Sequence, residues 1–206
     1  MPDFELEKTC RTAGYKIVCG VDEAGRGPWA GPVVAAAAVL DEPRLPAELA
    51  NAIDDSKKLT ALKRQALFTA FGDGIQIGIG QASVDEIDEM NILQATMLAM
   101  SRAVRALPAT PDFALIDGNR IPELGGIKAD CVVKGDARSL SIAAASIAAK
   151  VTRDRIMSEL AEQYPGYGWE RNAGYGTAQH QEALANLGVV SEHRKSFAPI
   201  RKILGA

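Results

Sequence analysis

The sequence predicts an α/β protein in which helices cover both faces of one mixed β-sheet. Strand-like apolar segments come first along the chain, and helical segments are interleaved and then gather towards the C-terminus. The continuous apolar run at 33–40 and the alternating run at 75–82 are typical of strands. A stripe of apolar residues from Ile92 to Leu107 repeats with the period of a helix.

The remaining elements follow from turn and cap residues. Strands are expected at 15–22, 33–40, 75–82, 113–116 and 131–133, and helices at 60–71, 91–107, 139–163, 177–187 and in the basic tail from Ser191. Thr60 is a suitable N-cap for the helix at 60–71. Prolines at 108 and 111 end the helix at 91–107. The many small residues in the first half of 139–163 predict a helix lying close against the sheet. We expect a single domain over 1–206, with a core at about 15–165 and a helical C-terminal segment at about 177–206.

Composition narrows the class of protein. The net charge of −3 argues against a protein that coats nucleic acid through charge alone, but not against an enzyme that binds a short stretch of it. No apolar stretch reaches the about 18 residues that span a membrane, and the polar N-terminus does not resemble a signal peptide. We therefore expect a cytoplasmic protein without a membrane association. Cys10, Cys19 and Cys131 are expected to be buried thiols.

Four carboxylates lie where strands are predicted to end. They are Asp22 and Glu23, Asp117, and Asp136. Because strand ends of an α/β sheet gather in one crevice, we expect these acids to converge. Glu23 would face away from Asp22 unless the chain turns there. Carboxylates held close together repel one another, and hard oxygen ligands without Cys or His favour Mg²⁺ or Mn²⁺. Taken singly, each Asp could equally be a turn or cap residue.

Other residues are candidates for substrate contacts. The loop of Gly25, Arg26 and Gly27 directly follows the paired acids, so its bare backbone can approach a sugar or phosphate. Lys57 can anchor a phosphate, and Tyr175, between two glycines, can stack on a sugar or base. Among the basic clusters, Arg194 is also expected to contact phosphate, and Lys63-Arg64 to be a solvated face. His180 is expected to be a structural helix residue and His193 an ordinary surface residue.

Together these segments resemble bacterial ribonuclease HII. They are VDEAGRGPWAGPV at 21–33, DSKKL at 55–59, IDG at 116–118, KGDARSLSIAAASIAAKVTRD at 134–154, GYGT at 174–177 and HRKSF at 193–197. The resemblance implies the RNase H-like fold, with a mixed sheet flanked by helices. It also implies cleavage of the RNA strand of RNA–DNA hybrids, and 5′ of single ribonucleotides in duplex DNA, by two-metal-ion hydrolysis that leaves 3′-hydroxyl and 5′-phosphate ends. The expected cofactor is Mg²⁺ or Mn²⁺, and the expected form is a monomer that binds nucleic acid.

The resemblance also assigns roles to residues. It makes Asp22, Glu23, Asp117 and Asp136 the catalytic and metal-binding acids. Its ribose-sensing loop falls on Gly25, Arg26 and Gly27, its phosphate contact on Lys57, and its deoxyribose-packing tyrosine on Tyr175. The related type HIII enzymes have an N-terminal extension and a lysine in place of the loop arginine, and this chain has neither.

Three other functions remain open on sequence alone. Another two-metal nuclease or phosphotransferase of this fold would keep the acids but has no need of the Gly-Arg-Gly loop or an exposed Tyr175. A non-catalytic hybrid-binding module would be expected to lack at least one acid. A structural α/β protein with acidic turns would gain no stability from divalent cations.

Overall fold

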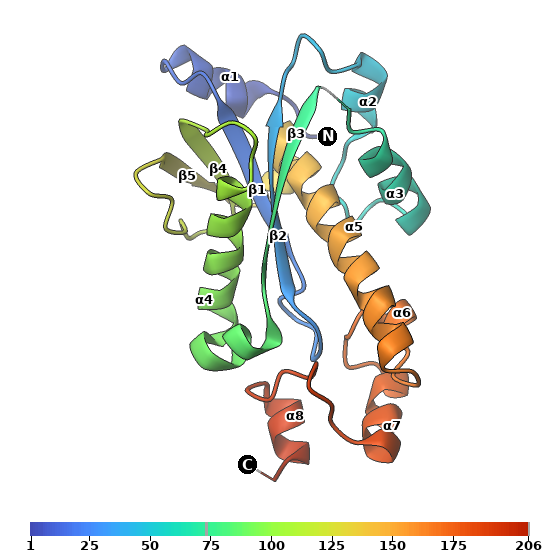
Figure 1. Cartoon of the computed structure of the whole chain (residues 1–206). Helices are drawn as coiled ribbons and strands as arrows, with labels where there is room; N and C mark the ends of the chain where they lie inside the picture. The colour runs from blue at the N-terminus through green and yellow to red at the C-terminus, as the bar shows by residue number, and fades with distance from the viewer. Residues whose placement is uncertain (73, 206) are drawn as a thin grey trace.

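Five strands form one mixed sheet in the computed structural model, which describes residues 1–72 and 74–205. The order across the sheet is β3-β2-β1-β4-β5 (Figure 1). The strands are β1 (Val18–Ala24), β2 (Val33–Leu40), β3 (Ile75–Ala82), β4 (Phe113–Asp117) and β5 (Lys128–Val132). β2 pairs antiparallel with both β1 and β3, whereas β4 pairs parallel with both β1 and β5. The sheet is therefore mixed, as the sequence predicts.

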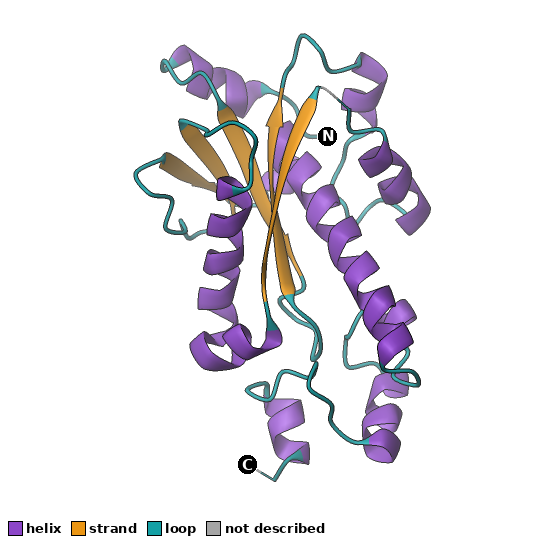
Figure 2. Cartoon of the chain, in the orientation of Figure 1, coloured by secondary structure: helices purple, strands orange, loops and turns teal. Residues whose placement is uncertain are grey.

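Two long helices cover the opposite faces of the sheet (Figure 2). Helix α4 (Val84–Arg105) packs on one face, and α5 (Leu140–Gln163) packs on the other. The alanines of β2 alternate between them, with Ala35 and Ala37 in the α4 core and Ala36 and Ala38 in the α5 core. This alternation follows from the period of two in a strand, and it explains a continuously apolar run that is buried on both faces.

Small side chains bring α5 close to the sheet. The helix begins at Leu140, with the Ser139 hydroxyl accepting a hydrogen bond from the backbone N–H of Ile142. At the facing point of β1, a Cβ on Gly20 would meet the backbone of Ser141 and Ile142. The close packing predicted for this helix is confirmed, and it brings the start of α5 against Gly20 in the first half of β1.

The smaller helices complete the chain. They are α1 (Glu5–Thr12), α2 (Ala47–Ala52), α3 (Ala61–Thr69), the 3₁₀ turn η1 (Gly135–Ala137), α6 (Trp169–Asn172), α7 (Ala178–Leu187) and α8 (Ala198–Ile203). Among these, α1, α2, η1 and α6 are absent from the sequence prediction. Helix α4 begins earlier than expected, because a capping box at Ser83 and Glu86 opens a first segment that is bent at Asn91, where φ is 72°. Thr60 caps α3 as predicted.

The burial of the cysteines is only partly as expected. Cys10 and Cys19 are buried, but Cys131 is exposed. Cys131 lies on β5, which is an edge strand of the sheet and has exposed positions on most of its length. No helix in the described part of the chain combines the length and the apolar character needed to cross a membrane.

Candidate active site

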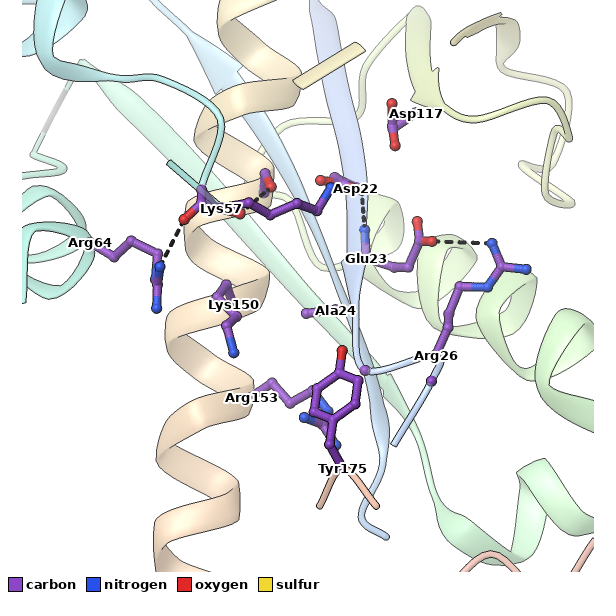
Figure 3. Close-up of a pocket in the computed structure, with 14 residues that line it drawn as sticks. Asp22, Glu23, Ala24, Arg26, Lys57, Arg64, Asp117, Lys150, Arg153 and Tyr175 are labelled. Carbon is purple, nitrogen blue, oxygen red and sulfur yellow. Dashed lines mark hydrogen bonds and ion pairs between the residues drawn. The ribbon is translucent and has the colours of Figure 1, made fainter. Parts of the chain in front are cut away.

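Two parallel strands bring three of the predicted acids together. The β1–β4 pairing runs from Val18 opposite Phe113 to Val21 opposite Ile116, so the next residues, Asp22 and Asp117, lie beside each other where the pairing ends. One carboxylate oxygen each from Asp22, Glu23 and Asp117 lies within 4.8 Å of the others (Figure 3). The convergence expected from the strand ends is present for these three residues.

Glu23 reaches the cluster by a different route from the one predicted. The strand continues through Glu23 to Ala24, so the chain does not turn at this residue. However, β1 extends past its pairing with β4 here, which leaves space on that side for the longer glutamate side chain to bend towards Asp117. The Arg26 Nη1 atom lies 3.4 Å from Glu23 Oε1 and forms an ion pair with this carboxylate.

The electrostatics of this cluster favour a bound cation. Burial, followed by the charges of Glu23 and Asp117, raises the pKa of Asp22 well above its ordinary value. The pKa of Glu23 is raised by burial and by Asp117, against the opposing charge of Arg26. Burial also raises the pKa of Asp117, although the Gly135 N–H donates a hydrogen bond to it. Three crowded carboxylates with raised pKa values, one buried and two partly buried, fit a divalent cation, whose charge would offset their repulsion.

Asp136 lies beside this cluster and has a different partner. It sits on η1 and is buried, and its Oδ2 atom is 3.2 Å from the Nζ atom of Lys57. The negative charge of Asp136 repels that of Asp117 and raises the pKa of Asp117. Asp136 is not among the three acids whose oxygens lie within 4.8 Å of one another.

A pocket connects the acids with the other predicted substrate contacts. It is lined by Asp22, Glu23, Ala24, Gly25, Arg26, Gly27, Ser56, Lys57, Arg64, Asp117, Ser146, Lys150, Arg153 and Tyr175. Tyr175 is 48% exposed, and its ring stands opposite the Gly25–Gly27 loop (Figure 3). Gly25, Arg26, Gly27, Lys57 and Tyr175 therefore line one pocket, whereas Arg194, also expected to contact phosphate, does not, and the roles of the five remain predictions.

Three residues at or behind this site make contacts that the sequence interpretation missed. Arg194, expected to contact phosphate, is fully buried and donates hydrogen bonds to backbone carbonyls. His193, expected on the surface, is fully buried against His180. Arg64 is not simply solvated, because it donates to the carbonyls of Ser56 and Leu59 and lines the pocket. A glycine- and proline-rich loop has many carbonyls without a regular partner, and that is the signal that could have predicted buried arginines.

The fold and the site agree with known proteins. The family model described as Ribonuclease HII matches residues 19–200. Proteins named Ribonuclease HII from Rhodospirillum rubrum and Ruegeria pomeroyi are 57% and 56% identical, covering 99% and 98% of this chain and 92% and 85% of their own lengths. The crystal structure of ribonuclease H2 from Pyrococcus horikoshii superposes with a TM-score of 0.75 at 30% identity, covering 91% of this chain and 97% of that one. On this basis the chain belongs to the ribonuclease HII family, whose members are metal-dependent endonucleases.

Proposed function

We propose that this protein cleaves the RNA strand of RNA–DNA hybrids and also cuts 5′ of single ribonucleotides embedded in duplex DNA, leaving 3′-hydroxyl and 5′-phosphate ends. The observation that carries the proposal is the position of three clustered acids next to the Gly25–Gly27 loop and Tyr175 in one pocket. Membership of the ribonuclease HII family supports cleavage of RNA paired with DNA.

Asp22, Glu23, Asp117 and Asp136 would hold the metal in this proposal. When bound, two Mg²⁺ or Mn²⁺ ions would supply Lewis acidity, activating water and offsetting the charge that develops on the scissile phosphodiester. The protein contributes fixed ligands: Gly135 N–H donates to Asp117 at 2.7 Å, and Glu23 N–H donates to Asp22 at 2.7 Å. These bonds hold the carboxylates in place before substrate arrives, so little reorganisation accompanies the reaction.

The remaining pocket residues would select the substrate. The 2′-hydroxyl is what distinguishes RNA from DNA, and a glycine-lined loop beside the acids can approach it closely. Tyr175 presents an exposed ring face to the neighbouring deoxyribose, and Lys57 presents an ammonium group to a phosphate. Contacts of this kind position a duplex without reading its base sequence, so we expect little sequence preference.

The test is cleavage of matched duplexes with and without Mg²⁺ or Mn²⁺. Duplexes of one sequence would be all-DNA, all-RNA, RNA–DNA hybrid, and DNA with a single ribonucleotide. We expect metal-dependent cleavage of the last two only. Cleavage of the all-DNA duplex would instead favour a general two-metal nuclease, and binding without cleavage would favour a hybrid-binding module.

A further inference from the structure

His193 and Arg194 are consecutive buried residues connected to the two loops of the pocket, Arg194 directly and His193 through His180. They precede α8, far in sequence from the Gly25–Gly27 loop, and each is 0% exposed. Arg194 contacts the loop that carries Gly25, Arg26 and Gly27, whereas His193 contacts His180, which holds the backbone of Tyr175. A single dipeptide of the C-terminal segment thus connects the two loops that the proposed function requires.

All five N–H donors of Arg194 point to backbone carbonyls. The acceptors are the oxygens of Gly25 at 2.6 Å, Pro28 at 2.8 Å, Gly31 at 2.9 Å, Arg26 at 3.1 Å and Pro32 at 3.1 Å. No carboxylate in the described chain forms an ion pair with it. Burial, followed by the charge of Arg153, lowers the pKa of Arg194 to about 9. Burying a charge without a counter-ion costs free energy of folding. The charge-assisted hydrogen bonds that Arg194 donates to these carbonyls must therefore offset that cost.

Fixing the carbonyls leaves the other side of the loop free. The amide N–H groups of Arg26 and Gly27 donate to no described residue. Below the loop, a Cβ on Gly25 would meet the Arg153 guanidinium, and Arg153 itself donates to the carbonyls of Ala30, Pro32 and Ala173. Two arginines therefore hold the loop, while the amide N–H groups of Arg26 and Gly27 have no acceptor in the described part of the chain and could donate to a hydroxyl or phosphate oxygen.

The hydrogen bonds of the two histidines require one pair of neutral tautomers. Val190 N–H donates to His193 Nδ1, so the His193 proton lies on Nε2 and is donated to His180 Nε2 at 3.0 Å. His180 Nε2 also accepts from Trp169 Nε1 at 3.2 Å. The His180 proton must then lie on Nδ1, which donates to the Tyr175 carbonyl at 3.0 Å. This chain of bonds fixes the backbone of Tyr175 from the buried side.

We propose that His193 and Arg194 are positioning residues that align the Gly25–Gly27 loop and Tyr175 for recognition of a ribonucleotide. The inference rests on the proposed function, because it concerns how that pocket distinguishes a ribose from a deoxyribose. Neither residue is exposed to substrate, so each acts through the backbone that it holds.

The role of Arg194 is tested by the selectivity for a ribonucleotide over all-DNA duplex, rather than by activity alone. Arg194→Lys keeps the charge but loses the planar fork, and Arg201→Lys is the matched control on an exposed arginine. We would measure KM for a duplex with one ribonucleotide and Ki for an all-DNA duplex of the same sequence as competitor. A role in stability alone reduces active enzyme and leaves Ki/KM unchanged. We expect Arg194→Lys to lower Ki/KM at least about fivefold and Arg201→Lys to leave it as in wild type.

The role of His193 is tested with two amide variants, His193→Gln and His193→Asn. Gln places its amide nitrogen near the position of Nε2 and keeps the bond to His180, whereas Asn reaches only the position of Nδ1. We expect His193→Asn to lower the ratio of kcat/KM on a single ribonucleotide to kcat/KM on a long hybrid, and His193→Gln to preserve it. In a Tyr175→Ala background, His193→Asn should have no further effect on this ratio.

Each result has a distinct meaning. A wild-type enzyme that fails to cut the single-ribonucleotide duplex would overturn the proposed function itself. A wild type that cuts it, with an unchanged Ki/KM in Arg194→Lys or with equal effects of the two His193 variants, would overturn the positioning roles and leave the proposed function intact. If Arg194→Lys does not fold, as judged by its melting transition, the two His193 variants decide the matter.

Discussion

Lys57 pairs with Asp136 at the edge of the acidic cluster, with 3.2 Å between Nζ and Oδ2. The lysine side chain is 79% exposed, whereas the aspartate side chain is only 7% exposed. Partial burial opposes the charge on Lys57, but the charge of Asp136 and their hydrogen bond raise the pKa of the lysine overall. Lys57 therefore presents a fixed positive charge at the mouth of the pocket, where a phosphate can approach it.

Replacing Lys57 should weaken substrate binding and its dependence on salt. We expect Lys57→Met to lower kcat/KM about tenfold and to reduce the slope of log(kcat/KM) against log[salt] by about one, because one phosphate contact is lost. Lys58→Met is the matched control, since Lys58 pairs with Asp54 outside the pocket. Identical slopes in wild type and Lys57→Met would show that Lys57 does not contact phosphate.

Removing one acid should abolish cleavage and stabilise the metal-free protein. Because the folded-state pKa values of Asp22 and Asp117 are raised, the metal-free protein loses stability as pH rises from the ordinary carboxyl range through those values. At neutral pH, Asp22→Asn or Asp117→Asn should therefore melt higher than wild type in the presence of a chelator.

Added metal should reverse this order. Mn²⁺ at about 100 times its Kd would stabilise wild type by about 2.7 kcal/mol, and it should stabilise the variants much less. Asp85→Asn, on an exposed residue of α4, is the control and should respond to metal as wild type does. A variant with near-normal turnover would contradict the assignment of these acids to the metal site.

The sequence predicted much of this site because the signals were local. An acid directly after an apolar run, as at Asp22 and Asp117, is predicted to lie at the end of a strand. Because the strand ends gather at one edge of the sheet, the pattern also predicts that these acids are neighbours. The strands β2 and β3 were predicted with their observed bounds, since alternation and uninterrupted apolar runs are strong signals.

What the sequence could not show are contacts between distant segments. Nothing near Arg194 indicates that its partners are carbonyls at 25–32, and a charged residue is by default expected on the surface. His193 was misplaced for the same reason. Helix α1 was missed because it has few apolar residues. The Oε1 atom of its buried Glu7 accepts hydrogen bonds from the hydroxyls of Ser139 and Ser141, more than 130 positions along the chain.

The buried histidine pair should make the protein sensitive to acid. Burial, followed by the charge of His180, lowers the pKa of His193 to about 4 from 6.5, and burial also lowers the pKa of His180. Above the histidine pKa of the unfolded chain, near 6.5, both histidines are neutral in the folded and unfolded states and the protein keeps its full stability. As pH falls towards 4, the unfolded chain binds protons that the folded protein does not, and the free energy of unfolding decreases. For His193 this loss is about 3 kcal/mol.

Replacing His193 isolates this effect from the titration of the acids. Urea unfolding at pH 7 and pH 4.5 should show that wild type loses more stability than His193→Gln over this interval. An equal loss in both proteins would mean that the pair is not what titrates.

Alanine at Gly25 should mainly reduce stability, whereas alanine at Gly27 should mainly weaken substrate binding. Gly25 has φ +95° and lies over Arg153, so Gly25→Ala should destabilise the protein by about 2–4 kcal/mol in urea unfolding. A Cβ on Gly27 would lie 3.3 Å from Tyr175 Cε1, and the exposed ring can move away. Gly27→Ala should therefore change stability by only about 0.5 kcal/mol. It should raise KM for the single-ribonucleotide duplex, and comparable loss of stability in both variants would contradict this distinction.

Tyr175 should matter most where only one site of cleavage exists. Its ring is exposed opposite the Gly25–Gly27 loop, where it can pack on a sugar; the comparable stacking of a base on an aromatic ring is worth about 1–3 kcal/mol. In a long hybrid, many registers offer a ribonucleotide, whereas a single embedded ribonucleotide offers one junction with deoxyribose. Tyr175→Ala should therefore reduce kcat/KM on the single-ribonucleotide duplex more than on the hybrid, and Tyr175→Phe, which keeps the ring, should preserve the ratio. If the ratio is the same in wild type and Tyr175→Ala, the tyrosine is a packing residue and the junction is recognised elsewhere in the pocket.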